Sequence, residues 1–236
     1  MLNFNNFSQM TIEQLRAKSQ SSHKKGYSPV IIEGRIIAQT WWGQKWCENL
    51  ENYADYENRI QRGKRYVKSG AVIDLVIEEG LIKALVQGSS SRPYKVVIKI
   101  DPLSDSKKKE ILELAKNKIE NMESLITGEF PLDLAEVFLN SETGLFPNPD
   151  EIEINCNCPD WAYLCKHAAA VLYGIGAKLD ENPLMFFLLR SVDFNLFLKK
   201  TIDEKIDLML KNIHTSDERI IPNEEAKQLF GFDFIE

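Results

Sequence analysis

Runs of β-branched residues in the middle of the chain predict a small β-sheet. Between residues 65 and 100, the segments "SGAVIDLVIEEG", "LIKALVQGSSS" and "RPYKVVIKI" are separated by Glu79 and Gly80 and by a turn rich in glycine and serine. Short runs with such turn signals predict a three-stranded antiparallel meander. In the third segment, apolar residues alternate with a mostly basic set, so one face of that strand is expected to be apolar and the other basic.

Helical spacing precedes these strands. In "TWWGQKWCENL", Trp42, Trp46 and Leu50 recur at four-residue steps, which predicts a short amphipathic helix. We expect this aromatic face, with Cys47 beside it, to belong to the core, because free cysteine is commonly buried.

Helical patterns also dominate the C-terminal half of the chain. Ser104 or Asp105 is a candidate N-cap for a helix that Gly128 would end, and Pro131 suits the first turn of a following helix. Beyond residue 180, "NPLMFFLLRSV" and "FNLFLKKTIDEKIDLMLKNI" predict two more helices. The expected fold class is therefore α+β, a small antiparallel meander packed with helices.

The same patterns divide the chain into five segments. The first thirty residues contain the polar run "KSQSSHKKGYSP" and are expected to form a loosely structured arm or linker. The other boundaries follow the change from strands to helices and the position of a cysteine-rich stretch. The segments are the N-terminal arm (1–30), a basic β-rich region (31–100), a helical connector (101–150), a cysteine-rich finger (151–191) and an acidic helical C-terminal region (192–236).

Charge is distributed unevenly between the two halves of the chain. The 236 residues carry a net charge of -6, but residues 1–100 contain 15 Lys and Arg against 9 Asp and Glu, whereas residues 101–236 contain 14 against 26. This asymmetry is compatible with a polyanion-binding N-terminal half. The opening "MLNFNNFSQM" lacks the features of a secretory signal, and the longest apolar runs are too short to cross a bilayer. We therefore expect a cytoplasmic protein with reduced cysteines and no membrane partner.

The stretch "NCNCPDWAYLCKH" (155–167) holds three of the four cysteines and one of the three histidines. The preceding "DEIEIN" predicts a strand, and residues two apart on a strand project to the same side, so Cys156 and Cys158 can present both sulfurs to one point. Cys165 and His167 would lie about 200° apart within a helix. They can converge only where the chain enters the helix that "AAAVLYGIGA" predicts, and "PDWAY" supplies the reversal between the two pairs.

Three thiolates and one imidazole at this spacing predict a structural zinc site. A Cys₃His set suits tetrahedral Zn²⁺, and four protein ligands close the coordination shell, whereas a catalytic zinc normally keeps one position open. Lys166 and the positive end of the following helix would temper the negative charge of such a site. A disulfide would leave one cysteine and the histidine without a role, and the motifs of thioredoxin-type redox sites and nucleobase deaminases are absent. The expected cofactor is one structural Zn²⁺ on Cys156, Cys158, Cys165 and His167.

The motif "CNCPDWAYLCKHAAAVLY" resembles the SWIM zinc finger, whose pattern is C-x-C followed by C-x-H. The segments "TWWGQKW", "RGKRYVKSGAVIDLVI", "LVQGSSSRPYKVVI" and "ENPLMFFLLR" are similar to parts of bacterial SWIM zinc finger family proteins of about this length. The resemblance covers residues 34–191, and the family's four ligands fall on the four residues named above. It implies zinc binding and contact with DNA or proteins. The family's association with Swi/Snf-type ATPases and with transposases implies such an ATPase as a possible partner.

Two basic groups indicate a nucleic-acid-binding surface in the β-rich region. The segment "RIQRGKRYVK" (59–68) and the strand after the "GSSS" loop concentrate arginine and lysine, which make most phosphate contacts. Tyr66 or Tyr94 could stack on an exposed base. The alternative is that these charges only solvate a hairpin. The candidate nucleic-acid-binding residues are Arg59, Arg62, Lys64, Arg65, Lys68, Arg92 and Lys95.

A protein-interaction role is the second hypothesis. The acidic C-terminal region ends in "EEAKQLFGFDFIE" (224–236), whose apolar residues could dock into a groove on a partner such as an ATPase, or pack on the protein's own core. An enzyme is the weakest of the three classes, because the chain lacks a glycine-rich phosphate loop, a nucleophile near a histidine and a carboxylate pair with catalytic spacing. The sequence therefore predicts a non-enzymatic zinc-binding accessory protein that binds nucleic acid, first of all DNA, with a protein adaptor as the alternative.

Overall fold

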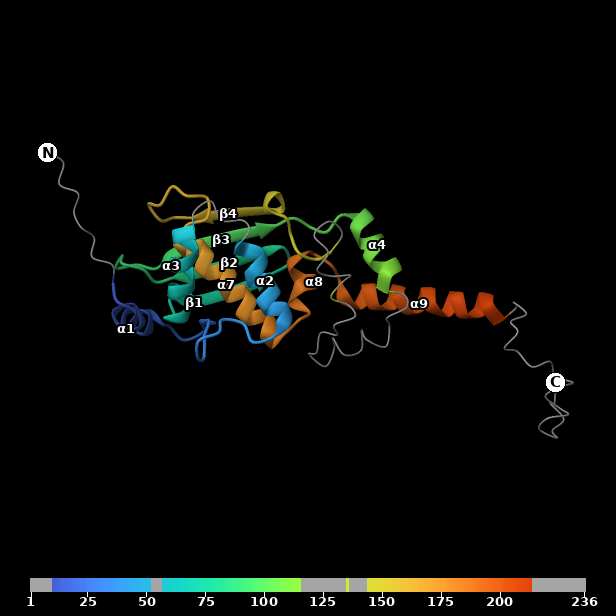
Figure 1. Cartoon of the computed structure of the whole chain (residues 1–236), viewed down its shortest axis with the longest axis horizontal. Helices are drawn as coiled ribbons and strands as arrows, with labels where there is room; N and C mark the ends of the chain where they lie inside the picture. Colours follow the sequence, from blue (N-terminus) through green and yellow to red (C-terminus); the bar gives the residue numbers. More distant parts are fainter. Residues whose placement is uncertain (1–9, 52–56, 116–134, 136–143, 214–236) are drawn as a thin grey trace, which may run out of the picture.

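The computed structural model describes residues 10–51, 57–115, 135 and 144–213, and Figure 1 shows how the elements are arranged. Helices α1 (Ile12–Ser22), α2 (Trp41–Glu51) and α3 (Glu57–Lys68) precede strands β1 (Val72–Glu78), β2 (Leu81–Val86) and β3 (Tyr94–Ile100). The later elements are α4 (Asp105–Ala115), the short 3-10 helix η2 (Pro149–Glu151), β4 (Ile152–Cys156), α7 (Lys166–Glu181), α8 (Met185–Leu189) and α9 (Phe194–Ile213).

The strands form one antiparallel sheet in the order β1-β2-β3-β4. The predicted meander of β1, β2 and β3 is confirmed, as is the α+β fold class. Strand β4 pairs with β3, with Ile152 opposite Ile100 and Cys156 opposite Val96. The strand predicted before the cysteine cluster is therefore the fourth strand of the sheet, and it brings the first cysteine of the cluster to the sheet.

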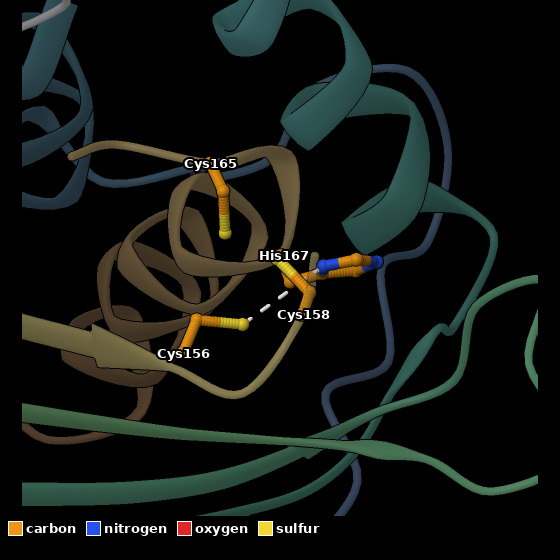
Figure 2. A group of neighbouring side chains, drawn as sticks. All are labelled: Cys156, Cys158, Cys165 and His167. Carbon is orange, nitrogen blue, oxygen red and sulfur yellow. Dashed lines mark hydrogen bonds between the residues drawn. The ribbon is translucent and has the colours of Figure 1, made fainter. Parts of the chain in front are cut away.

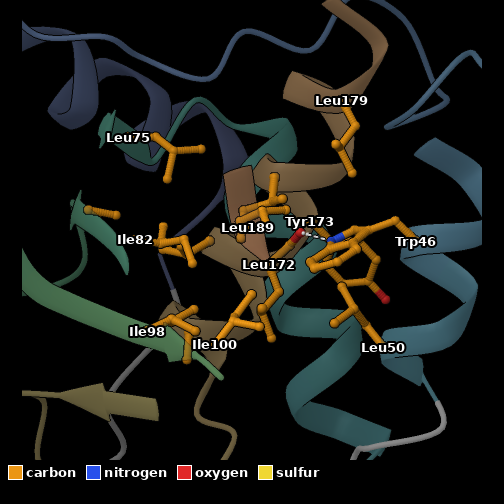
Figure 3. Close-up of a cluster of buried hydrophobic side chains, with 14 of the residues drawn as sticks. Trp46, Leu50, Leu75, Ile82, Ile98, Ile100, Leu172, Tyr173, Leu179 and Leu189 are labelled. Atoms are coloured by element: carbon orange, nitrogen blue, oxygen red, sulfur yellow. Dashed lines mark hydrogen bonds between the residues drawn. The ribbon is translucent and has the colours of Figure 1, made fainter. Parts of the chain in front are cut away.

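Helix α7 packs across the sheet and forms the centre of the core. The predicted alternation in β3 is confirmed, because Val96, Ile98 and Ile100 are buried against this helix side while Lys95 and Lys99 are exposed. Burial of such apolar side chains throughout the core is the dominant favourable term in folding. Figure 3 shows the isoleucines of the sheet in one cluster with side chains of α7 and α2.

The predicted aromatic helix is α2, and its apolar face is buried as expected. The indole of Trp46, which is 1% exposed, donates a hydrogen bond to the backbone oxygen of Leu172 on α7 at 2.9 Å. The indole of Trp42 donates likewise to Leu179 at 2.8 Å. Burial raises the pKa of Cys47 to about 12, so this cysteine remains a neutral thiol within the packed helix pair. These contacts fix α2 along α7.

The basic segment 59–68 is expected within a β-rich region, but it forms helix α3 instead. Ile60 and Val67 are buried, and with Gly63 between them they make an apolar stripe that packs on α7. A Cβ atom on Gly63 would lie 2.5 Å from the Cβ of Ala169, so glycine allows the two helices to approach closely. The many cations on the other faces of the helix hide the helical spacing of these apolar residues in the sequence.

The expectation of a loosely structured arm is also wrong for residues 12–22, which form α1. Thr11 and Gln14 make a capping box at its start: the Thr11 hydroxyl accepts from the Gln14 amide at 3.1 Å, and the Gln14 side chain accepts from the Thr11 amide at 2.9 Å. Leu15 is 1% exposed, so a single apolar side chain anchors a mostly polar helix. The capping pattern was present in the sequence as a signal for this helix.

The C-terminal helices begin where the sequence predicts. The Ser104 hydroxyl accepts from the Lys107 amide at 3.3 Å, so Ser104 caps α4. The helix end at Gly128 and the helix after Pro131 lie outside the described residues. The two helices predicted beyond residue 180 correspond to α8 and α9. None of the helices in the described ranges has the length and hydropathy that a bilayer crossing requires.

Candidate metal centre

The four predicted ligands converge at the junction between β4 and α7. Cys156 ends β4, Cys158 follows in the loop, Cys165 directly precedes α7 and His167 lies in its first turn. Their ligand atoms all lie within 4.8 Å of one another. Figure 2 shows the three thiols and the imidazole directed toward a common space. The chain therefore brings together the four side chains that the spacing singled out.

Helix capping explains how two residues two positions apart can face one point. Cys165 has extended backbone angles (φ -72°, ψ 165°) and is the N-cap of α7, and its sulfur accepts a hydrogen bond from the Ala168 amide at 3.5 Å. Because Cys165 stands outside the helical turn, the 200° separation of a regular helix does not apply to it and His167. The predicted position of the second ligand pair, at a helix entry, is confirmed.

The loop between the two ligand pairs (157–164, here called the cysteine loop) is held to its surroundings on both sides. Asn157 exchanges hydrogen bonds with the backbone of Lys95 on β3, through its side-chain oxygen at 2.9 Å and its amide at 3.2 Å. Asp160 forms a bidentate pair with Arg59 of α3, at 3.0 and 3.1 Å. The hydroxyl of Tyr163 donates to the backbone oxygen of Ile152. These contacts place the loop between the sheet and α3.

The orientation of His167 makes Nδ1 the candidate ligand atom. Nδ1 lies 4.0 Å from the sulfur of Cys156, whereas Nε2 points away and is buried with no hydrogen-bond partner. The imidazole, 1% exposed, is held by the ring of Tyr94 at 4.3 Å and by that of Tyr66 at 5.3 Å between centroids. A Cβ on Gly88 would lie 3.1 Å from Nε2, so this glycine leaves room for the ring. These contacts orient the ring with Nδ1 toward the cysteine sulfurs.

The electrostatics of the cluster favour a soft cation. Interaction with the Cys156 thiol lowers the pKa of Cys165, which favours the thiolate form of this sulfur. The same interaction raises the pKa of Cys156, and burial raises the pKa of Cys158. Burial lowers the pKa of His167, which keeps the imidazole neutral and able to coordinate. A metal must displace the protons of the two thiols, as is usual for thiolate sites.

The donor set fits zinc. Three sulfurs and one imidazole nitrogen match the ligands of structural zinc sites, in which sulfur lies about 2.3 Å and nitrogen about 2.0–2.1 Å from the ion. The SWIM zinc finger family matches residues 136–174, a span that contains all four ligands. The chain contains a SWIM zinc finger. The resemblance seen in the sequence is thereby confirmed.

The likeness extends beyond the SWIM finger to one curated relative. A Mycobacterium tuberculosis (strain ATCC 25618 / H37Rv) protein described as "Uncharacterized protein Rv2102" is 37% identical over 172 residues, covering 69% of this chain. The alignment covers 62% of that protein, so this chain spans less than two thirds of its relative's length. No solved structure matches the chain. The comparisons therefore identify the SWIM finger and a homologue.

The predicted nucleic-acid residues fall into three groups. Arg59 pairs with Asp160, and Lys64 pairs with Glu51 at 2.6 Å, so both cations are engaged within the protein. Arg92 and Lys95 are exposed near the SWIM finger, and Lys68 is half-buried at the end of α3. The remaining two, Arg62 and Arg65, line a cleft, and Arg65 also donates a hydrogen bond to the backbone oxygen of Met10.

This cleft, of about 640 Å³, lies between α3, the loop before β3 and the SWIM finger. Lys166, which stands between two of the ligands in sequence, lines it together with the two arginines. From its place in the sequence, Lys166 is expected only to temper the charge of the metal site. Its place beside α3 follows from the packing of α3 on α7, which a sequence pattern does not show. The cleft is lined by Met10, Leu15, Arg62, Arg65, Tyr66, Ser89, Ser90, Tyr94, Pro159, Asp160 and Lys166.

Proposed function

We propose that the protein is a non-enzymatic accessory module in which a structural Zn²⁺ holds the SWIM finger and a basic surface beside it binds nucleic acid, first of all DNA. The observation that carries this proposal is the position of the Cys₃His cluster directly behind a cleft whose rim is basic. Zinc bound to this cluster would crosslink the surrounding elements and stabilise the fold, and it would not act as a catalytic centre.

The structural role of the metal is supported by the elements that its ligands join. Cys156 belongs to the sheet, Cys158 to the cysteine loop, and Cys165 and His167 to the start of α7. One ion on these four side chains would tie three parts of the fold together. Four protein donors fill a tetrahedral shell, so no position is left for a substrate. We therefore expect the metal to contribute folding free energy and no catalysis.

Nucleic-acid binding is supported by cations that form no ion pair with an acidic side chain within the described residues. Arg62 and Lys166 line the cleft, and Arg92 and Lys95 are exposed nearby. Arginine and lysine make most of the phosphate contacts in protein–DNA complexes, and small hydroxyl residues assist. Ser89 and Ser90 supply such hydroxyl residues at the same rim. The overall charge of -6 is then no obstacle, because the acidic residues gather mainly after residue 100.

The salt dependence of DNA binding tests this proposal. The affinity should fall steeply as salt rises, because binding releases counterions from the phosphates. Replacing Arg62 and Arg65 with Ala together should flatten the slope of log K against log salt by up to about 2, or roughly 0.9 per lost phosphate contact. The control replaces Arg35 and Lys45, which are exposed and lie outside the cleft, and removes the same charge. Equal slopes for the two double variants would exclude the cleft side as the binding surface.

A protein adaptor remains the second candidate, and helix α9 is the observation that favours it. Ile202, Ile206, Met209 and Leu210 are between 39% and 56% exposed and recur along one side of the helix. An amphipathic helix with such a side can dock in a partner's groove. The tail 224–236, which the sequence also offers for docking, lies outside the described residues and remains a prediction.

Recovery of a partner from cells tests the adaptor role. A Swi/Snf-type ATPase, the partner implied by the family resemblance, should be recovered with the tagged chain and stay bound after nuclease treatment. Ile206→Glu should abolish that recovery, while Lys83→Glu on the sheet should not. Recovery that is lost on nuclease treatment would show a nucleic-acid tether instead.

A further inference from the structure

We infer that the cleft beside the SWIM finger binds an unpaired nucleotide of a single-stranded nucleic acid, with its phosphate on the arginines and lysine and its base against a tyrosine. This inference rests on the proposed function and deepens it, because it names the form of nucleic acid and the residues that distinguish it. It is carried by two features of one cavity, its cations and its aromatic rings.

The cations of the cleft come from two helices that pack against each other. Arg62 and Arg65 belong to α3, and Lys166 begins α7. Among the described residues of the lining, Asp160 is the one carboxylate, and it is already held by Arg59 at 3.0 and 3.1 Å. The cleft is therefore net positive, and its serine-containing wall, Ser89 and Ser90, adds neutral hydrogen-bonding groups. An anion with several oxygens, such as a phosphodiester, fits this lining.

The aromatic rings of the cleft are held in place from behind. Tyr94 lies over His167 with a tilt of 31° between the rings, and Tyr66 meets the same imidazole edge-on at 70°. Both tyrosines also line the cleft. The Lys166 ammonium lies 5.9 Å from the centroid of the Tyr66 ring, so a cation and a ring lie side by side. Aromatic rings fixed in this way lose little freedom when a base stacks on them.

A concave site with these groups favours a single strand over a duplex. The volume of about 640 Å³ lies within the range of small-ligand pockets, which suits one nucleotide. In a duplex the bases are paired and stacked inside the helix, so only the phosphates could reach the arginines and the tyrosines would have no partner. In a single strand the base is free to stack, and aromatic side chains next to a basic groove are the usual means of binding it.

The metal site and the cleft share a wall. Pro159 and Asp160 of the cysteine loop line the cleft, and Tyr66 and Tyr94 rest on the candidate ligand His167. Zinc that fixes the loop and the histidine would therefore also fix this wall. Single-strand binding in the cleft should accordingly require the metal. Phosphate contacts made by cations elsewhere on α3 should not require it.

The experiment measures binding of a labelled 12-nucleotide DNA single strand and of the same strand annealed to its complement. The full chain with zinc should bind the single strand at least about tenfold more tightly. Tyr94→Leu should weaken single-strand binding on the order of tenfold, because the stacking of one base on an aromatic ring contributes about a factor of ten to the affinity. The same substitution should leave duplex binding unchanged. Tyr94→Phe, which retains the ring, should bind the single strand like wild type. Arg62→Gln should weaken it as well, and the matched control Arg35→Gln should not.

Zinc content is measured on every variant, because Tyr94 contacts a candidate ligand. If Tyr94→Leu loses metal, Arg62→Gln decides the question, since Arg62 lies on the cleft rim away from the ligands. Equal or tighter duplex binding, or unchanged single-strand binding by both Arg62→Gln and a zinc-loaded Tyr94→Leu, would overturn the inference and leave the proposed function standing. Displacement of the strand by poly-glutamate at equal charge would also overturn it, because it would show a site for anions in general. Failure of both DNA forms to bind would contradict the proposed function itself.

Discussion

A valine at Gly63 tests whether the close crossing of α3 and α7 supports the whole site. This glycine allows the helix that carries Arg62 to lie against the helix that carries His167. A Cβ at this position would stand 2.5 Å from the Cβ of Ala169 and 3.1 Å from the backbone of Ala169 and Ala170. Ordinary van der Waals contact begins at 3.4 Å, so the helices must separate by about 0.9 Å for the first carbon alone.

Overpacking of this kind costs about 1–3 kcal/mol, and the two methyl groups of valine favour the upper part of that range. Because glycine and valine differ by only a few tenths of a kcal/mol in helix propensity, the loss comes from packing. We expect urea unfolding to show a loss of about 2 kcal/mol for Gly63→Val, or a melting temperature lower by about 4–8 °C. Gln61→Val, at an exposed position of the same helix, should cost less than about 0.5 kcal/mol. Equal losses for the two variants would refute the reasoning.

Two further substitutions test contacts that position the core helices. Asp180 accepts hydrogen bonds from the amides of Gln39 at 2.5 Å and Thr40 at 3.1 Å, so its carboxylate, near the end of α7, holds the segment that leads into α2. Asp180→Ala should destabilise the protein by about 1–2 kcal/mol in urea unfolding, and a loss below about 0.5 kcal/mol would contradict this role. Burial raises the pKa of Glu151, but the hydrogen bond from Arg190 (2.8 Å) and the other contacts of this carboxylate outweigh it, so the pKa lies below its ordinary value of 4.5. A lowered pKa stabilises the folded state above the unfolded-state pKa, and this stability is lost as the pH falls through the folded-state pKa. The stability difference between wild type and Glu151→Gln should therefore be present at pH 7 and shrink below about pH 4.5. A difference that stays constant between pH 7 and pH 3.5 would contradict the assignment.

The sequence predicted the metal cluster more completely than the surface next to it. The four ligands could be found because coordination imposes a local rule: two residues on a strand and two at a helix entry must face one point. That rule involves thirteen consecutive residues and requires no knowledge of distant contacts. The strands were predictable for a similar reason, since alternation and turns are local features.

The elements that the sequence did not predict depend on contacts between distant segments. The buried stripe of helix α3 consists only of Ile60, Gly63 and Val67 and lies among many cations. The glycine can be recognised as a packing residue only once the helix that lies against it is known. The pairing of β4 with β3 joins residues more than fifty positions apart. The cleft combines the N-terminal end of α7 with α3, so Lys166 could be assigned to it only from the structure.

The metal content of the purified full chain tests the central claim most directly. Elemental analysis after gel filtration at neutral pH should find one zinc per chain in wild type and in Cys47→Ser, whose cysteine lies outside the cluster. Cys158→Ser should retain far less zinc and melt at a lower temperature, because metal binding and folding are coupled at structural sites. Wild-type protein without stoichiometric zinc, or Cys158→Ser with one equivalent and unchanged melting, would contradict the account.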